Sequence, residues 1–129
     1  MLTFTIDSSS AKALDDAISF TELTPSVYRI SIHISDVASL IKNGSSLDLE
    51  ALKRGATTYV LKSFHMPMLP YQMNNVLSLV QGAPRLAITL SININSTGIV
   101  DFSTASYDMT ILENIKKLSY TSADNLIFD

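Results

Sequence analysis

Apolar and polar residues alternate along several segments of the chain, with the period of two that is typical of β-strands. The clearest segment runs from Tyr28 to Ser35, where four large apolar residues alternate with arginine, serine and histidine. This segment predicts a half-buried strand. Four more strands are predicted at residues 2–7, 17–23, 85–94 and 99–106, of which 85–94 is the strongest, with turns at Thr24–Ser26 and Asn95–Gly98.

Two helices are predicted between residues 36 and 59. The first, residues 36–42, is short, and Asp36 fits a capping role at its start. The second runs from about Leu47 to Tyr59, and Gly55 favours an early end. Its apolar face is predicted from residues at helical spacing: Leu49, Leu52, Ala56 and Tyr59.

The remaining segments are irregular or weakly helical. The two prolines within Met66–Pro70 exclude a regular helix or a central strand, so these residues are predicted to form an ordered connector. A short helix is predicted around Met73–Leu79, and residues 111–117 and 122–128 have weak helical character. The predicted class is therefore α+β, with a mainly antiparallel sheet and two or three helices.

Composition narrows the class of protein. A length of 129 residues with 47% apolar and 16% charged residues predicts one globular domain over residues 1–129. No apolar run is long enough to cross a bilayer, so no membrane partner is expected. The absence of cysteine excludes disulfides and thiolate metal sites and fits a cytoplasmic location. Nine basic residues and a net charge of −3 give a weak electrostatic footprint for nucleic acid, so any RNA binding would rest on metal, stacking and shape.

Three aspartates lie close together near the start of the chain. Asp7 ends one apolar alternation, and the pair Asp15–Asp16 precedes another. Carboxylates at the point where strands give way to a loop can converge, and Mg2+ prefers oxygen ligands. From the residues alone, an aspartate pair is more often part of a turn or a helix cap than a metal site.

Four sequence blocks stand in one order along the chain: Phe4–Asp7 with Leu14–Ile18; Tyr28–Val37; Gly44–Tyr59; and Met66–Pro70 with Leu77–Leu79 and Arg85–Ala87. Together they cover roughly residues 2–120. In this order and spacing they resemble the N-terminal part of the catalytic (RNB) domain of the RNase II and RNase R exoribonuclease family. The resemblance implies a partial RNB-type domain that hydrolyses single-stranded RNA from its 3′ end with Mg2+ or Mn2+. It also implies release of nucleoside 5′-monophosphates, with no DNA expected as a substrate.

The resemblance also assigns roles to individual residues. The family's aspartate motif has four members, and Asp7, Asp15 and Asp16 match the first, third and fourth as catalytic metal ligands. The second falls on Ala13, whose methyl group cannot bind a metal ion. The tyrosine that packs on the 3′-terminal nucleotide in the family matches Tyr59.

Tyr120 resembles a second RNA-stacking tyrosine of the family, and aromatic stacking suits binding that is indifferent to sequence. For His33 and His65, a structural role is favoured over general-base catalysis. The family also has flanking cold-shock-type and S1 domains and a downstream phosphate-contacting arginine, so the chain is expected to be part of a longer protein and weak or inactive alone. Ala13 leaves three alternatives open, namely an active exoribonuclease, a degenerate RNA-binding domain and a structural remnant.

Overall fold

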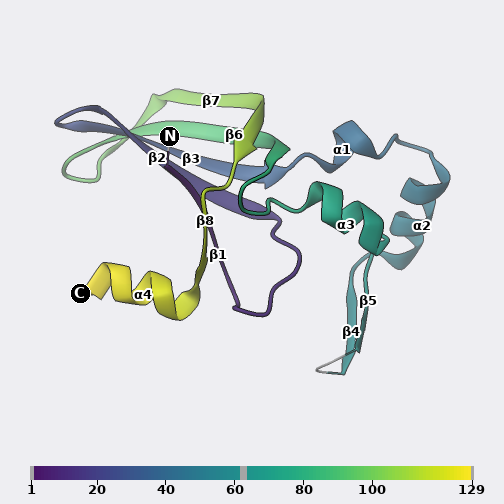
Figure 1. Ribbon diagram of the computed structural model, residues 1–129. Coiled ribbons are helices and arrows are strands. Elements are labelled where there is room, and N and C mark those ends of the chain that lie inside the picture. The colour runs from purple at the N-terminus through teal and green to yellow at the C-terminus, as the bar shows by residue number, and fades with distance from the viewer. Residues whose placement is uncertain (1, 62–63, 129) are drawn as a thin grey trace.

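The computed structural model describes residues 2–61 and 64–128, and its main element is a twisted six-stranded sheet (Figure 1). The strand order is β7-β6-β3-β2-β1-β8, and every neighbouring pair is antiparallel except β1 and β8, which are parallel. The strands are β1 (Leu2–Asp7), β2 (Asp16–Thr24), β3 (Val27–Ser35), β6 (Pro84–Asn95), β7 (Val100–Glu113) and β8 (Lys116–Ser119). The predicted α+β class with a mainly antiparallel sheet is confirmed.

Among the described residues, four helices lie around the sheet, where two or three were predicted, together with a small hairpin. In Figure 1, α1, α2 and the hairpin extend from one end of the sheet beside α3, whereas α4 follows β8. The elements are α1 (Val37–Leu40), α2 (Ser46–Arg54), α3 (Tyr71–Leu77), α4 (Tyr120–Phe128) and the hairpin of β4 (Thr58–Leu61) and β5 (Phe64–Met66). Within the described part of the chain, no helix is both long and apolar enough for a membrane crossing.

The helix predicted from Leu47 to Tyr59 is shorter in the structure. It ends at Arg54 because Gly55 adopts a positive φ of 72°, which glycine reaches without steric cost. Tyr59 therefore lies in β4 and not on a helix face. The predicted apolar face is wrong as well, since Leu49 and Leu52 are exposed and the buried residue of α2 is Ala51.

Two other predictions are corrected. The segment 111–117 is not helical, because it completes β7 and begins β8. The β4–β5 hairpin was not predicted, and Met66, expected in an ordered connector, ends β5. Asp36 does cap α1, since its Oδ1 accepts from the backbone N–H of Ser39.

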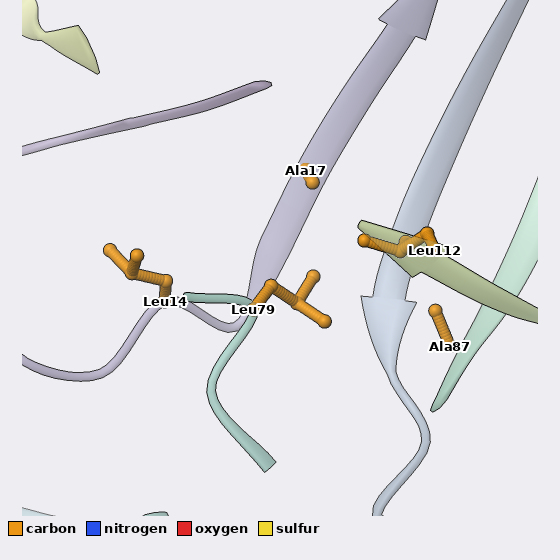
Figure 2. Close-up of a cluster of buried hydrophobic side chains, with 5 residues drawn as sticks. All are labelled: Leu14, Ala17, Leu79, Ala87 and Leu112. Atoms are coloured by element: carbon orange, nitrogen blue, oxygen red, sulfur yellow. The ribbon is translucent and has the colours of Figure 1, made fainter. Parts of the chain in front are cut away.

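One buried apolar cluster joins the aspartate loop (residues 8–15) to the sheet. Its members, shown in Figure 2, are Leu14, Ala17, Leu79, Ala87 and Leu112. A second cluster beneath α2 and α3 consists of Ile41, Ala51, Leu69 and Leu77. Because Leu14 belongs to the first cluster, the loop that carries Ala13 and Asp15 is fixed by core packing.

The buried face of the sheet is its polar face. Ile32 and Ile34 remain 47% and 49% exposed, whereas His33 between them is 1% exposed. Hydroxyl groups satisfy the buried imidazole, since His33 Nε2 lies 2.8 Å from Ser19 Oγ and Nδ1 lies 2.7 Å from Thr89 Oγ1. Buried polar groups with partners avoid the cost of lost hydration, so His33 has the structural role that was expected.

We expect stability to fall as the pH drops below about 6.5, the ordinary pKa of histidine, because of His33. Burial lowers its pKa in the native state, so the unfolded chain takes up a proton before the native one does. The unfolded state then binds more protons, and the free energy of unfolding decreases with falling pH. Urea unfolding of the wild type and of His33→Gln between pH 5 and 7.5 measures this, and equal pH slopes would contradict it. Asp7 contributes to both proteins alike and cancels in the difference.

Candidate active site

A cavity of about 230 Å3 lies where the aspartate loop, α3 and the β4–β5 hairpin meet. The side chains on its wall include one carboxylate, two rings and several small or apolar groups. Among them are Ala13, Asp15, Ser35, Tyr59, His65 and Leu77. The structure thus brings together Ala13, Asp15 and Tyr59, three positions that the sequence resemblance singles out.

Backbone contacts on both sides hold the aspartate loop in place. The Leu14 N–H donates to Ser78 Oγ at 2.9 Å, and the Leu79 N–H donates back to the Leu14 carbonyl at 2.8 Å. On the other side, Lys117 Nζ donates to the Ala11 carbonyl at 2.6 Å. The loop is therefore clamped between the end of α3 and β8, which limits the freedom of its acidic side chains.

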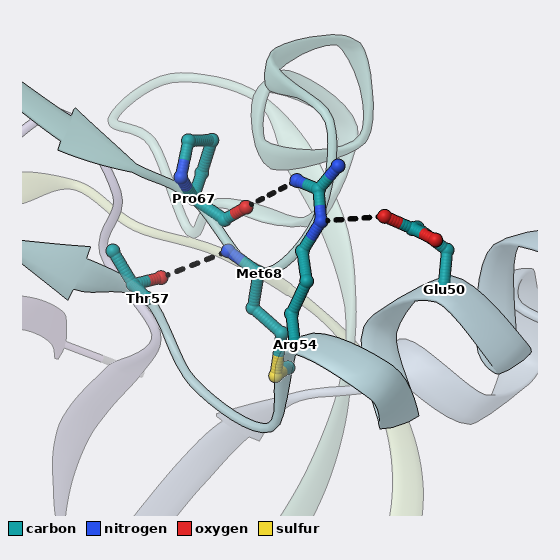
Figure 3. A network of polar contacts seen from close by, with 5 residues as sticks. All are labelled: Glu50, Arg54, Thr57, Pro67 and Met68. Atoms are coloured by element: carbon teal, nitrogen blue, oxygen red, sulfur yellow. Dashed lines mark hydrogen bonds and ion pairs between the residues drawn. The ribbon is translucent and has the colours of Figure 1, made fainter.

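A polar network fixes the base of the β4–β5 hairpin (Figure 3). Arg54 Nη1 donates to the Pro67 carbonyl at 2.8 Å, and Arg54 Nε pairs with Glu50 Oε1 at 2.9 Å. Below them, the Met68 N–H donates to Thr57 Oγ1 at 3.1 Å. These contacts hold together the two ends of the segment from Thr57 to Met68, which contains Tyr59 and His65.

Burial and neighbouring charges act on the carboxyl group of Asp7. Burial raises the pKa of the Asp7 carboxyl above its ordinary value, and the negative charges of Asp16 and Asp15 raise it further against the opposing effect of Lys117. In addition, Asp7 Oδ2 is buried without a hydrogen-bond partner. A buried, unpartnered carboxylate oxygen beside two like charges is an environment that a cation would stabilise.

The donor chemistry fits a divalent cation, but the geometry is incomplete. Among residues 2–61 and 64–128, no three acidic, histidine or cysteine side chains are grouped closely enough to hold an ion. Asp15 lines the cavity, whereas Asp7 and Asp16 are not among its lining residues. Ala13, where a carboxylate would complete the motif, occupies the cavity wall instead.

The two candidate stacking tyrosines lie at different places. Tyr59 is 78% exposed at the rim of the cavity, which excludes a role in the core. Tyr120 is 60% exposed at the start of α4, outside the cavity. It directly follows Ser119, which pairs with Asp7 in the β1–β8 ladder. Tyr120 therefore lies near the Asp7 end of the aspartate loop, whereas Tyr59 shares the cavity with Asp15 at the other end.

Sequence reasoning missed two residues that shape this region. Lys117 of β8 clamps the aspartate loop, and no local pattern indicates this because the contact depends on the pairing of β8 with β1. Tyr71, the first residue of α3, follows directly on a segment interpreted as a connector, and its hydroxyl lies 3.3 Å from His65 Nε2.

Comparisons with known proteins agree with this fold. The RNB domain model matches residues 1–129. Ribonuclease R of Thermotoga maritima is 36% identical over 128 residues, which are 97% of this chain and 17% of the relative. The inactive exonuclease DIS3L2 of Arabidopsis thaliana is 35% identical over 123 residues, covering 95% of this chain and 12% of the relative. RNase R of Mycoplasma genitalium in complex with double-stranded RNA has the same fold, with a TM-score of 0.88, 24% identity, and coverage of 98% of this chain and 22% of the other.

The fold is therefore that of an RNase R-type nuclease domain, and the chain belongs to the RNB domain family. It spans about a fifth or less of the length of these relatives. A ribonuclease and a protein named as an inactive exonuclease both occur among them, so membership places the chain in an RNA-degrading family without fixing its catalytic state.

Proposed function

We propose that this chain supplies the RNA 3′-end pocket of a Mg2+-dependent 3′-to-5′ exoribonuclease that releases nucleoside 5′-monophosphates from single-stranded RNA. The observation that carries the proposal is the shared cavity of Asp15 and Tyr59. At one cavity, a carboxylate can bind the phosphate of a nucleotide through a cation, and an exposed aromatic ring can stack on the base of the same nucleotide. RNA as the ligand is supported by the RNA complex of RNase R from Mycoplasma genitalium.

The acidic residues would hold the cation in this proposal. Asp15 offers an oxygen from the cavity wall, and Asp7 offers the buried Oδ2 that lacks a partner. Asp16 adds negative charge beside Asp7. When bound, Mg2+ would neutralise the charge that develops on the scissile phosphate.

The second candidate function is a degenerate domain that binds RNA without cutting it. Ala13 favours it, because the cavity wall lacks the carboxylate that the family motif has at this position. Tyr59 and the cavity would still bind the terminal nucleotide.

Cleavage and binding assays distinguish the two. We expect the full chain to release mononucleotides from 3′-labelled single-stranded RNA in the presence of Mg2+ or Mn2+ if it is an exoribonuclease. A gel shift without cleavage would support the RNA-binding function instead. Absence of both would contradict both and leave a structural remnant.

We expect Tyr59→Ala to weaken RNA binding by about fivefold or more, equivalent to ~1 kcal/mol or more, because one stacked base is lost. The side chain is exposed, so the free energy of unfolding should change by less than about 0.5 kcal/mol. Fluorescence anisotropy with a labelled oligonucleotide and urea unfolding measure the two quantities. Tyr107→Ala removes an exposed ring from β7 and is the matched control. Equal RNA affinities of wild type and Tyr59→Ala would contradict the stacking role.

A further inference from the structure

Three rings from three different elements form a continuous group at the rim of the cavity. Tyr59 of β4 and His65 of β5 are directly opposite each other in the hairpin ladder. Their ring centroids are 5.8 Å apart with an angle of 29° between the planes. Tyr71 of α3 meets His65 edge-on, with centroids 5.8 Å apart and an angle of 75°.

The geometry makes His65 the centre of the group. One face of its ring stacks on Tyr59, and its Nε2 lies 3.3 Å from the Tyr71 hydroxyl. Tyr59 and His65 both line the cavity, while Tyr71 is 53% exposed beside it. The hydroxyl contact restricts rotation of the imidazole, and the imidazole in turn restricts the ring of Tyr59.

The spacing determines where a nucleobase can bind. Aromatic rings in contact have centroids about 4.5–7 Å apart, so a separation of 5.8 Å leaves no space for a third ring between Tyr59 and His65. With one face of Tyr59 covered by His65 and 78% of the side chain exposed, the opposite face is open. A base would therefore stack on that open face, with His65 supporting the ring from behind.

We propose that His65 is a positioning residue that, held by the Tyr71 hydroxyl, fixes the Tyr59 ring as a preorganised stacking surface for the 3′-terminal nucleobase of RNA. The inference rests on the proposed RNA-binding function and extends it to two residues outside the aspartate motif. Preorganisation matters because an exposed tyrosine that rotates freely loses side-chain entropy when it stacks on a ligand.

The test compares two short 5′-labelled oligoadenylates that differ only at the 3′ end, one with a terminal adenine and one with an abasic terminal nucleotide. Binding to the full chain is measured by anisotropy in the presence of a chelator, so that cleavage does not compete. The ratio of the two dissociation constants isolates the contribution of the terminal base. For the wild type we expect a ratio of about fivefold or more.

His65→Ala should lower this ratio to near one, and His65→Phe, which keeps a ring against Tyr59, should restore most of it. Tyr71→Phe removes only the hydroxyl and should reduce the ratio partially. Tyr107→Ala is the matched aromatic control and should leave the ratio unchanged. Thermal unfolding establishes that each variant is folded, and Tyr71→Phe decides the question if His65→Ala does not fold.

Each failure has a separate meaning. If the wild type binds neither oligonucleotide, the proposed RNA-binding function fails and this inference with it. If it binds both equally, RNA binding stands but the stacking surface is overturned. A ratio that is unchanged in His65→Ala, or lost equally in His65→Ala and His65→Phe, overturns the positioning role of His65. If His65→Ala does not fold, an unchanged ratio in Tyr71→Phe overturns it.

Discussion

Replacing Ala13 with aspartate should increase the affinity of the chain for Mg2+ by about tenfold or more, equivalent to ~1.4 kcal/mol. Ala13 lies on the cavity wall together with Asp15, so the new carboxylate would face the same space. Added anionic oxygen strengthens a hard cation site, and two-metal phosphoryl chemistry needs several such oxygens. RNA cleavage by Ala13→Asp should accordingly exceed that of the wild type under identical conditions.

The same substitution should destabilise the metal-free protein. A further negative charge on the cavity wall with Asp15 adds like charge to the aspartate loop, where such charge already raises the pKa of Asp7. Bound Mg2+ should reverse this loss, because a ligand that binds only the folded state stabilises it. Calorimetric Mg2+ titration and the melting temperature with and without Mg2+ measure both effects. Ala13→Asn matches the size of aspartate without its charge and should show neither effect. An unchanged Mg2+ titration in Ala13→Asp would mean that position 13 does not face the cation.

Local sequence patterns predicted most strands correctly because their information is local. The alternation at Tyr28–Ser35 fixes a strand whatever packs on it, and Pro25 and Gly98 mark the turns that join β2 to β3 and β6 to β7. The pattern did not reveal which face is buried. Burial of His33 depends on hydroxyls that β2 and β6 bring across the sheet, and those partners are far away in the sequence.

The errors at Tyr59 and in the tail have a related cause. Helical spacing through Gly55 continued as far as Tyr59, but the chain turns at Gly55 and forms a hairpin fixed by Arg54. The segment 111–117 becomes strand because β6 and β1 offer open edges to it. Tertiary pairing overrides weak helical propensity in such cases.

The candidate site likewise has a part that the sequence could predict and a part that it could not. The aspartate motif could be located in the sequence because its residues are close together in the chain. The cavity could not, because Asp15 and Tyr59 meet only after the loop packs against α3 and the hairpin folds beside it. The roles of Lys117 and Tyr71 depend on contacts across 106 and 6 residues, and no local pattern encodes them.

We expect the second large effect from Asp7→Asn, which should raise the stability of the metal-free protein while weakening its cation binding. The Asp7 carboxylate is destabilised in the native state by burial and by the charges of Asp16 and Asp15, and its Oδ2 has no partner. Removing the charge relieves these costs, so the melting temperature without metal should increase. Such a conflict between stability and function is common where an active site holds like charges together.

The pH dependence identifies Asp7 as the cause. Because the pKa of Asp7 is raised above 3.8 in the native state, its charge costs stability at pH values above that raised pKa. The cost disappears as the pH falls below 3.8, where the carboxyl is protonated in both the folded and unfolded states. The stability gained in Asp7→Asn should therefore be full at neutral pH and vanish below about pH 3.8.

Urea unfolding of Asp7→Asn and the wild type with a chelator, at neutral and acidic pH, measures the gain. Mg2+ titration and the RNA cleavage assay measure the loss, which we expect to be at least about tenfold in affinity, with no detectable turnover. Asp108→Asn changes an exposed aspartate of β7 and should alter neither quantity. If Asp7→Asn lowers stability without metal, Asp7 has a structural function in the native state. If it retains Mg2+ affinity, the cation site does not include Asp7. A metal ligand destabilised by neighbouring like charges requires both results together, namely higher stability without metal and lower Mg2+ affinity.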